Sequence, residues 1–256
     1  VRSDPSAMQT LTLADYEALK AEAKLIKDIS PLVNGSGQSI AGSNNWPTSI
    51  YGASPEYLKI RDWGVDEGSM FTEDDIESYA KVAVIGKTVQ ENLFPNENPI
   101  GKMIRFKNIP FKVIGVLKEK GENTFGQDQD DIIIAPYTAV QKRVLAQTYL
   151  QSIVASSQSE EDSENAVNEI KSIMETQHKI KPDEDNDFNV SSQQEIISMF
   201  SSTSEMLTIL LVAIASISLL VCGIGIMNIM YVSVKERTKE IGLRMDLGQI
   251  IDDDAT

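Results

Sequence analysis

Apolar residues are concentrated in one long run near the C-terminus of the chain. Residues 206–234 contain no charged side chain and read MLTILLVAIASISLLVCGIGIMNIMYVSV. A helix of about 20 residues crosses the hydrocarbon core of a bilayer, so this run predicts one transmembrane helix. The alternative is the buried core helix of a soluble protein, although such helices rarely stay uncharged on every face over this length.

Shorter patterns before this run predict a domain that mixes helices and strands. Leu13, Tyr16 and Leu19 follow Thr12 at helical spacing, and Asp15 completes an imperfect capping box; Ser30-Pro31 is expected to end this helix. Short apolar runs predict strands at residues 29–33, 49–51, 57–60, 81–85, 102–106, 111–117, 131–135, 150–155 and 188–190, with a tight hairpin at 107–110. Further helices are expected from residue 72, at 87–93, at 159–176, and from Ser191 into the apolar run.

The order of these segments predicts two lobes before the membrane helix. The helix and strand of residues 1–33 match the strand–helix–strand pattern of residues 150–190, so we expect them to form one α/β lobe near the membrane. Residues 34–149 are then an inserted lobe rich in β-strands. We predict an α+β fold of two lobes, followed by a stalk and transmembrane helix at 191–234 and a final segment and tail at 235–256.

Charged residues on either side of the apolar run predict its orientation. Four basic residues follow it, and the positive-inside rule places that end in the cytoplasm: Lys235, Arg237, Lys239 and Arg244. Residues 1–205 contain 19 basic and 32 acidic residues and are expected outside the membrane. The net charge of −15 for the whole chain argues against nucleic-acid binding, because binding to phosphates needs an excess of basic side chains.

The chain contains very few residues of the kind that bind metals or act as nucleophiles. One cysteine, Cys222, excludes a disulfide framework and a thiolate cluster, and one histidine, His178, excludes most histidine-based zinc sites. No nucleophile is arranged with His178 in the sequence, so a surface position is expected for it. We predict no catalytic residues, no metal and no cofactor, and therefore no enzyme.

Two other patterns suggest chemistry but fail on their spacing. Residues 86–88 (Gly-Lys-Thr) resemble the end of a phosphate-binding loop, but Lys81 stands where that motif requires a glycine, so a strand followed by a helix cap is expected. Three aspartates resemble the first ligands of a calcium loop: Asp183, Asp185 and Asp187. Phe188 and Gln194 replace the glycine and glutamate of such a loop, and a solvated acidic turn is expected instead.

Small and polar residues inside the apolar run favour contact with other membrane helices. Gly223 and Gly225 allow close approach of a second helix. Asn228 is the most polar side chain of the run and can hydrogen-bond to a neighbouring helix. Packing between helices is one interpretation of Asn228, and a functional role inside the membrane is the other.

Residues 216–245 closely resemble the second membrane helix and following cytoplasmic segment of MacB-type ABC transporter permeases, in the FtsX-like superfamily. Three motifs carry the resemblance: residues 223–228 (GIGIMN), 236–238 (ERT) and 240–244 (EIGLR). Four other stretches resemble the extracytoplasmic core domain of that family: residues 82–94, 98–102, 110–117 and 130–137. Cys222 stands where the family commonly has glycine.

The resemblance implies how such a chain works. It implies a homodimeric permease with a separate ATP-binding subunit or domain, whose closure is passed through membrane helices to outside domains. A membrane-fusion-type adaptor is a further expected partner, and the implied function is export of antimicrobial peptides, macrolide-like drugs or other extruded substrates. By this resemblance six residues face the ATPase: Glu236, Arg237, Glu240, Ile241, Gly242 and Arg244. Membrane anchoring by the basic members of this group is the alternative.

Two other functions share parts of this pattern. An FtsX-superfamily permease that controls a cell-wall hydrolase or senses peptide antibiotics would carry the same motifs, and a single-span binding protein would need only the one helix. After Met245 the family pattern continues into further helices, whereas residues 249–256 form a short acidic tail. We therefore expect a permease fragment in a bacterial cell membrane, with residues 1–205 outside and residues 235–256 in the cytoplasm.

Overall fold

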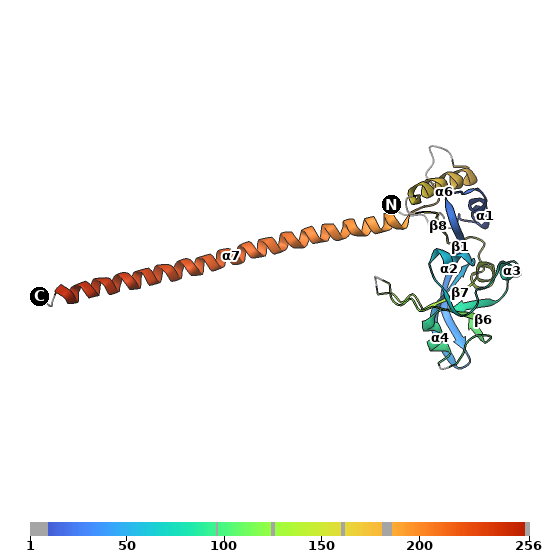
Figure 1. Cartoon of the computed structure of the whole chain (residues 1–256), viewed down its shortest axis with the longest axis horizontal. Helices are drawn as coiled ribbons and strands as arrows, with labels where there is room; N and C mark the ends of the chain where they lie inside the picture. The colour runs from blue at the N-terminus through green and yellow to red at the C-terminus, as the bar shows by residue number, and fades with distance from the viewer. Residues whose placement is uncertain (1–9, 96, 124–125, 160–161, 181–185, 254–256) are drawn as a thin grey trace. The chain divides into compact units, whose positions relative to one another are not determined.

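A computed structural model describes residues 10–95, 97–123, 126–159, 162–180 and 186–253, without the side chains of Met199 and of residues 243–253. The chain divides into two compact units, Val1–Ser192 and Gln193–Thr256 (Figure 1). The first unit contains a mixed sheet with short helices, and the second contains a single helix. The coarse prediction of a mixed domain followed by one long apolar helix is confirmed.

The strands of the first unit are β1 (Ile26–Ala41), β2 (Asn44–Ala53), β3 (Val65–Gly68), β4 (Val82–Ile85), β5 (Met103–Phe106), β6 (Ile109–Leu117), β7 (Ile132–Pro136) and β8 (Ser152–Ser157). Its helices are α1 (Leu13–Glu22), α2 (Glu56–Ile60), α3 (Glu73–Glu77), α4 (Lys87–Leu93), α5 (Tyr137–Ala139), the π-helical turn η2 (Val140–Leu145) and α6 (Ser163–His178). The strand order is β2-β7-β4-β6-β5-β1-β8, and β3 pairs with β6. The pairs β2–β7 and β4–β6 are parallel, and the other pairs are antiparallel.

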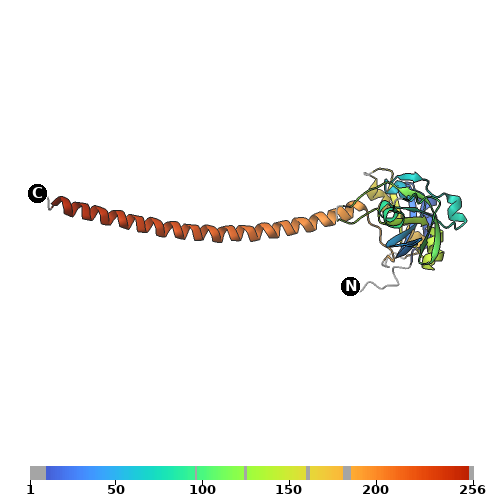
Figure 2. The ribbon, with the colours of Figure 1, turned by 90° about the horizontal axis from the view of Figure 1, so that it is seen from below.

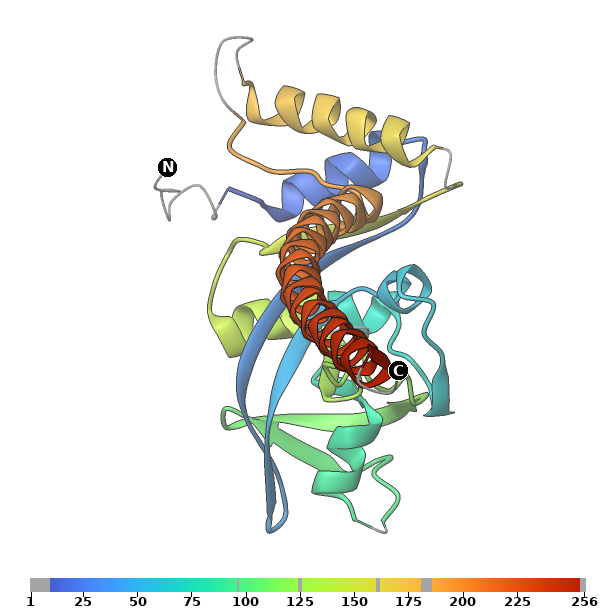
Figure 3. The same ribbon diagram turned by 90° about the vertical axis from the view of Figure 1, so that its left-hand side faces the viewer.

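Strand β1 changes partners along its length. Residues 26–32 pair with β8, and residues 33–41 pair with β2. Helices α1 and α6 contact each other, and Figure 3 shows them beside the first part of β1, with β2 beside the second part. A single continuous strand therefore connects the region of α1, α6 and β8 with the rest of the sheet.

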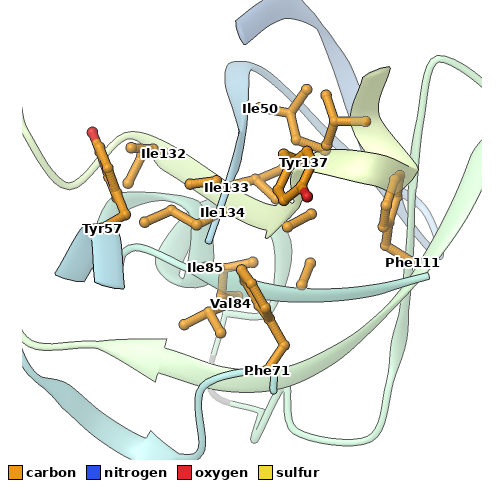
Figure 4. Close-up of a cluster of buried hydrophobic side chains, with 14 of the residues drawn as sticks. Ile50, Tyr57, Phe71, Val84, Ile85, Phe111, Ile132, Ile133, Ile134 and Tyr137 are labelled. Atoms are coloured by element: carbon orange, nitrogen blue, oxygen red, sulfur yellow. The ribbon is translucent and has the colours of Figure 1, made fainter. Parts of the chain in front are cut away.

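The hydrophobic core is centred on β7, which lies between β2 and β4. Ile133 and Ile134 of β7 are fully buried together with Ile85 of β4, and Phe111 of β6 joins them (Figure 4). A strand covered on both faces needs a continuous apolar run rather than an alternating pattern, which explains the sequence IIIAP. Each such side chain stabilises the fold by about 1.5–3 kcal/mol.

Several local predictions are confirmed because short-range signals decide them. The backbone nitrogen and Oγ1 of Thr12 both donate to Asp15 Oδ2, at 2.7 and 2.8 Å, and start α1 as a capping box. Thr72 begins α3 in the same way. Lys107 and Asn108, with φ of 45° and 68°, form the two-residue turn between β5 and β6, as the hairpin prediction requires.

Three predictions are wrong, each because another contact overrides the local pattern. The expected strand at 57–60 is helix α2, because Pro55 has φ of −58° and starts a helical turn there. Residues 188–190 form no strand in the described structure; side-chain contacts hold this segment instead. The helix that Ser30-Pro31 was expected to end, α1, already ends at Glu22. Pro31 instead lies within β1, opposite Ile153 of β8.

Gly86 connects β4 to α4 as a strand followed by a helix cap, which confirms that interpretation of residues 86–88. A Cβ at Gly86 would lie 2.1 Å from the carbonyl oxygen of Asp130. We therefore expect Gly86→Ala to lower the free energy of unfolding by about 3 kcal/mol, because backbone would have to move. Urea unfolding of the chain in detergent, followed by the fluorescence of Trp46 and Trp63, measures this loss.

Gly64→Ala is the matched control for this prediction. A Cβ at Gly64 would meet only the flexible end of Lys118, with Cδ 3.1 Å away, so a small change is expected. Equal urea midpoints for the two variants would contradict the packing described at Gly86.

Helix α7 (Gln193–Asp253) is a continuous, gently curved helix of 61 residues (Figure 2). At about 1.5 Å per residue it is roughly 90 Å long. It is the one helix in the described part of the chain that is long and apolar enough to cross a membrane. Its apolar side chains are exposed, as at Leu219 with 76% exposure. Such a surface is unusual for a soluble protein and suits lipid or other membrane helices.

Candidate functional site

The polar groups inside the apolar run of α7 are hydrogen-bonded within the helix. Thr208, Ser216 and Ser218 each donate to the carbonyl oxygen four residues earlier, at 2.7–3.0 Å. These bonds remove the cost of placing hydroxyl groups in hydrocarbon. The three hydroxyl groups are therefore satisfied within α7 itself.

The predicted packing residues Gly223, Gly225 and Asn228 all lie on α7, but not on one face. Gly225 and Asn228 are three residues apart and share a face, whereas Gly223 lies off that face. A Cβ added at either glycine would meet nothing within 4 Å. Nothing in the described chain requires these glycines, and their role in helix packing stays a prediction.

The end of the apolar run is marked by Tyr231 and Lys235. Lys235 Nζ lies 5.9 Å from the centre of the Tyr231 ring. Tyrosine with a neighbouring lysine is typical of the boundary between the bilayer core and water. Thr238, one turn further, donates to the carbonyl oxygen of Val234 at 2.8 Å, so the helix continues through this boundary.

Five of the six predicted coupling residues form a stripe on α7. At about 3.6 residues per turn, Glu236, Glu240, Arg244, Arg237 and Ile241 fall within roughly 140° of the helix circumference. Gly242 lies outside this stripe. The described side chains of the stripe are exposed, and the side chain of Arg244 lies outside the described part of the structure. The geometry thus brings charged groups and one isoleucine onto a single surface.

His178 is largely covered by its neighbours, so the prediction of a surface histidine is wrong. Its side chain is 10% exposed and lies between two carboxylates. The Nε2 atom is 3.3 Å from Asp15 Oδ1, and the Nδ1 atom is 2.9 Å from Asp187 Oδ1. The ring of Phe188 packs against the imidazole edge to face, with 5.7 Å between ring centres. Asp15 is far from His178 along the chain, so no local pattern of residues predicts that these two side chains meet.

Local chain geometry places these groups together. Helix α6 ends at His178, and Lys179 follows it with a left-handed φ of 55°. Asp187, of the predicted acidic turn, lies beside His178; Asp183 and Asp185 lie outside the described residues. The Oγ1 atom of Thr10, just before α1, donates to the carbonyl oxygen of Asp187 at 3.1 Å. Backbone and side chain of Asp187 are therefore both fixed just before α7 begins.

The surroundings of His178 favour its protonated form. Burial acts to lower its pKa, but the hydrogen bond to Asp187 and the charges of Asp15 and Asp187 act in the opposite sense, and the pKa is raised above its ordinary value. With both ring nitrogens facing carboxylate oxygens, the imidazolium form satisfies both contacts.

Helix α1 carries contacts onward from this cluster into the sheet region. The rings of Tyr16 and Tyr137 pack edge to face with 6.3 Å between their centres, which joins α1 to α5. Burial raises the pKa of Tyr137 to about 12. Lys20 Nζ lies 5.6 Å from the Tyr16 ring centre and 3.8 Å from Glu73 Oε1 in α3. One helix therefore contacts His178, α3 and α5.

Within the described ranges, no group of three or more His, Cys, Asp or Glu side chains is arranged so that it could hold a metal ion. The described chain therefore offers one candidate feature in each unit: the charged stripe on α7 in the second, and the contacts of Asp187 and Phe188 with His178 in the first.

Comparison with known proteins identifies relatives of the chain. The family described as MacB-like periplasmic core domain matches residues 1–173. The "Macrolide export ATP-binding/permease protein MacB" of Syntrophobacter fumaroxidans is 38% identical, over 94% of this chain and 41% of its own length. The protein of the same name from Chlorobium luteolum is 42% identical, over 94% of this chain and 36% of its own length. The chain thus spans about two fifths of the length of these curated relatives.

Solved structures share the fold. The periplasmic region of MacB from Actinobacillus actinomycetemcomitans has a TM-score of 0.64 at 24% identity, and covers 75% of this chain and 84% of its own. The extracellular domain of the noncanonic ABC-type transporter YknZ from Gram-positive bacteria has a TM-score of 0.58 at 21% identity. It covers 67% of this chain and 86% of its own. These likenesses concern the folded domain.

Proposed function

The chain belongs to the MacB-type family of ABC transporter permeases, and on this premise we propose that it passes ATP-driven movement through the membrane to an extracytoplasmic domain. The family match covers residues 1–173 of the first unit, and the family is that of a periplasmic core domain. Residues 1–205 then lie outside the membrane, and residues 235–256 lie in the cytoplasm.

The observation that carries this proposal is the continuity of α7. One helix contains both the apolar run of residues 206–234 and the charged stripe that begins at Glu236. A helix without a break transmits a displacement of one end to the other, because its backbone hydrogen bonds resist local bending. No kink-forming proline occurs between Gln193 and Asp253.

The partners follow from the family. ATP hydrolysis belongs to a separate ATP-binding subunit or domain, so this chain acts as a permease and not as an enzyme. The stripe of α7 contacts that ATPase, and two permease copies form a homodimer in the lipid membrane. An adaptor of the membrane-fusion type is a further partner for the outside domain.

We also propose that the first unit moves as two lobes. The lobe near the membrane contains α1, α6, β8 and the first part of β1, from residues 1–33 and 150–190. Residues 34–149 form the second, β-rich lobe. The change of β1 partners at Val33 supports this division, and the contacts of α1 with α3 and α5 link the lobes.

Export of macrolide-like drugs is the proposed activity, because the curated relatives carry that name. Expression of the full-length permease with its ATP-binding part and its adaptor, in a bacterium that lacks its own macrolide pumps, is expected to raise the minimum inhibitory concentration of erythromycin. The matched control inactivates the ATP-binding part, and tolerance should then return to the starting level.

An inserted, ATPase-active permease that leaves drug tolerance unchanged would contradict the export proposal. Altered control of cell-wall hydrolysis in the same strain would instead favour the signalling role of FtsX-type permeases.

A further inference from the structure

We propose that His178 is a positioning residue whose doubly protonated imidazole clasps the segment entering α7 to helix α1. We further propose that movement of α7 reaches the outside domain through this clasp. The second statement rests on the proposed function, whereas the first concerns the folded first unit alone.

The hydrogen-bond geometry around His178 supports the doubly protonated state. Each ring nitrogen faces a carboxylate oxygen, at 3.3 Å for Asp15 and 2.9 Å for Asp187. Neutral imidazole donates through only one nitrogen and would leave a lone pair of the other pointing at a carboxylate. Asp15 Oδ2 already accepts two bonds from Thr12, and Asp15 Oδ1 is the oxygen that faces His178 Nε2.

The position of the cluster along the chain gives it a mechanical role. Only residues 188–192 separate Asp187 from Gln193, the first residue of α7. A displacement of the start of α7 therefore acts on Asp187 through a short piece of backbone. Asp187 is held by its side chain on His178 and by its carbonyl oxygen on Thr10. The movement then reaches Asp15 of α1 through His178, and the chain just before α1 through Thr10.

The charged groups around His178 come from three segments. Asp15 faces it from α1, and Asp187 faces it from the segment before α7. On α6 itself, Glu175 accepts a bond from Asn186 Nδ2 at 3.1 Å, and Lys179 follows the helix end. Both groups that contact the ring are acidic, which is the arrangement that retains a proton on the imidazole.

The direction of the pH dependence follows from the raised pKa of His178. A folded-state pKa above the unfolded value of about 6.5 means that the clasp contributes fully below that value. Its contribution is lost as the pH rises through the raised pKa. We therefore expect the segment before α7 to be held tightly at mildly acidic pH and to loosen at higher pH.

Two measurements on the 256-residue chain in detergent test the clasp. His178 is the only histidine, so ¹⁵N resonances of its ring can be assigned directly if the affinity tag contains no histidine. Both nitrogens are expected to be protonated at pH 6. For the second measurement, spin labels at Glu22→Cys and Asn189→Cys, with Cys222→Ala, report the distance between α1 and the segment before α7.

The spin-label distance distribution is expected to be narrow at pH 6 and to broaden as His178 loses its proton. In His178→Gln it should be broad at every pH, with unchanged tryptophan fluorescence showing that the domain stays folded. Asn186→Ala is the matched control, because it removes the exposed bond to Glu175 and leaves the clasp intact. Its distribution should follow that of the parent chain.

A singly protonated ring at pH 6, or the same narrow distribution in His178→Gln, would overturn the clasp. In the full-length permease, His178→Gln should lower ATP-driven drug export while Asn186→Ala leaves it unchanged. Unchanged export in His178→Gln would contradict the transmission step only. A parent permease without export, but with the expected ring protonation and distances, would contradict the proposed function and leave the clasp standing.

Discussion

Arg244→Glu in the full-length permease is expected to abolish the stimulation of ATPase activity by substrate while leaving membrane insertion intact. Arg244 shares the stripe of α7 with Glu240 and Arg237, which we propose to contact the ATPase. Reversing one charge of a desolvated pair in a protein interface costs about 2–5 kcal/mol, or roughly a 30-fold or greater loss of affinity. ATP hydrolysis would continue, but without a response to substrate.

The matched control for this prediction is Lys235→Glu, which makes the same change of charge at the end of the apolar run. If the basic residues only anchor the helix at the membrane surface, Lys235→Glu should have the larger effect, because it lies closer to the bilayer. If they contact the ATPase, Arg244→Glu should have the larger effect. The ATPase activity of the reconstituted permease, measured with and without substrate, separates membrane anchoring from contact with the ATPase. Full stimulation in Arg244→Glu would rule out the coupling role.

Local signals in the sequence were sufficient for much of the first unit. The capping box of Thr12 and Asp15, the two-residue turn at Lys107 and the apolar strand of β7 depend on neighbouring residues or on a continuous buried run. Such features leave a pattern within a few positions of the chain. The uncharged run of residues 206–234 is the strongest of these signals and predicted α7.

Pairing across long distances left no such pattern. Residues 34–41 are rich in glycine and serine and have little strand propensity, yet they form the second part of β1 because β2 pairs with them along its length. The burial of His178 likewise depends on Asp15, in a different helix. A lone histidine in a polar sequence gave no reason to expect two carboxylates beside it.

The candidate site was predictable where it depends on composition and not where it depends on tertiary contacts. The charged residues after Val234 predict the stripe of α7 that would contact the ATPase, and that role remains a prediction. The cluster around His178 is not predictable from the sequence, in which Asp187 is only one of three closely spaced aspartates. Alternating acidic residues near the only histidine were the available signal, and only the fold shows that one of them reaches the ring.

The orientation of α7 is the premise on which the whole account depends. The basic residues after Val234 are expected to keep that end in the cytoplasm, because moving several positive charges across the membrane is unfavourable. The acidic domain before the helix then lies outside. Asn45 in β2 is exposed, and Lys239 lies beyond the apolar run, so cysteines at these positions report the two sides.

Labelling of these cysteines in spheroplasts is the most direct test. Each variant, Asn45→Cys or Lys239→Cys, is made in full-length permease that lacks Cys222, and is treated with a membrane-impermeant thiol reagent before and after lysis. We expect Asn45→Cys to be labelled in intact spheroplasts and Lys239→Cys to be labelled only after lysis. Labelling of Lys239→Cys in intact spheroplasts, with Asn45→Cys protected until lysis, would contradict an outside domain driven from the cytoplasm through α7.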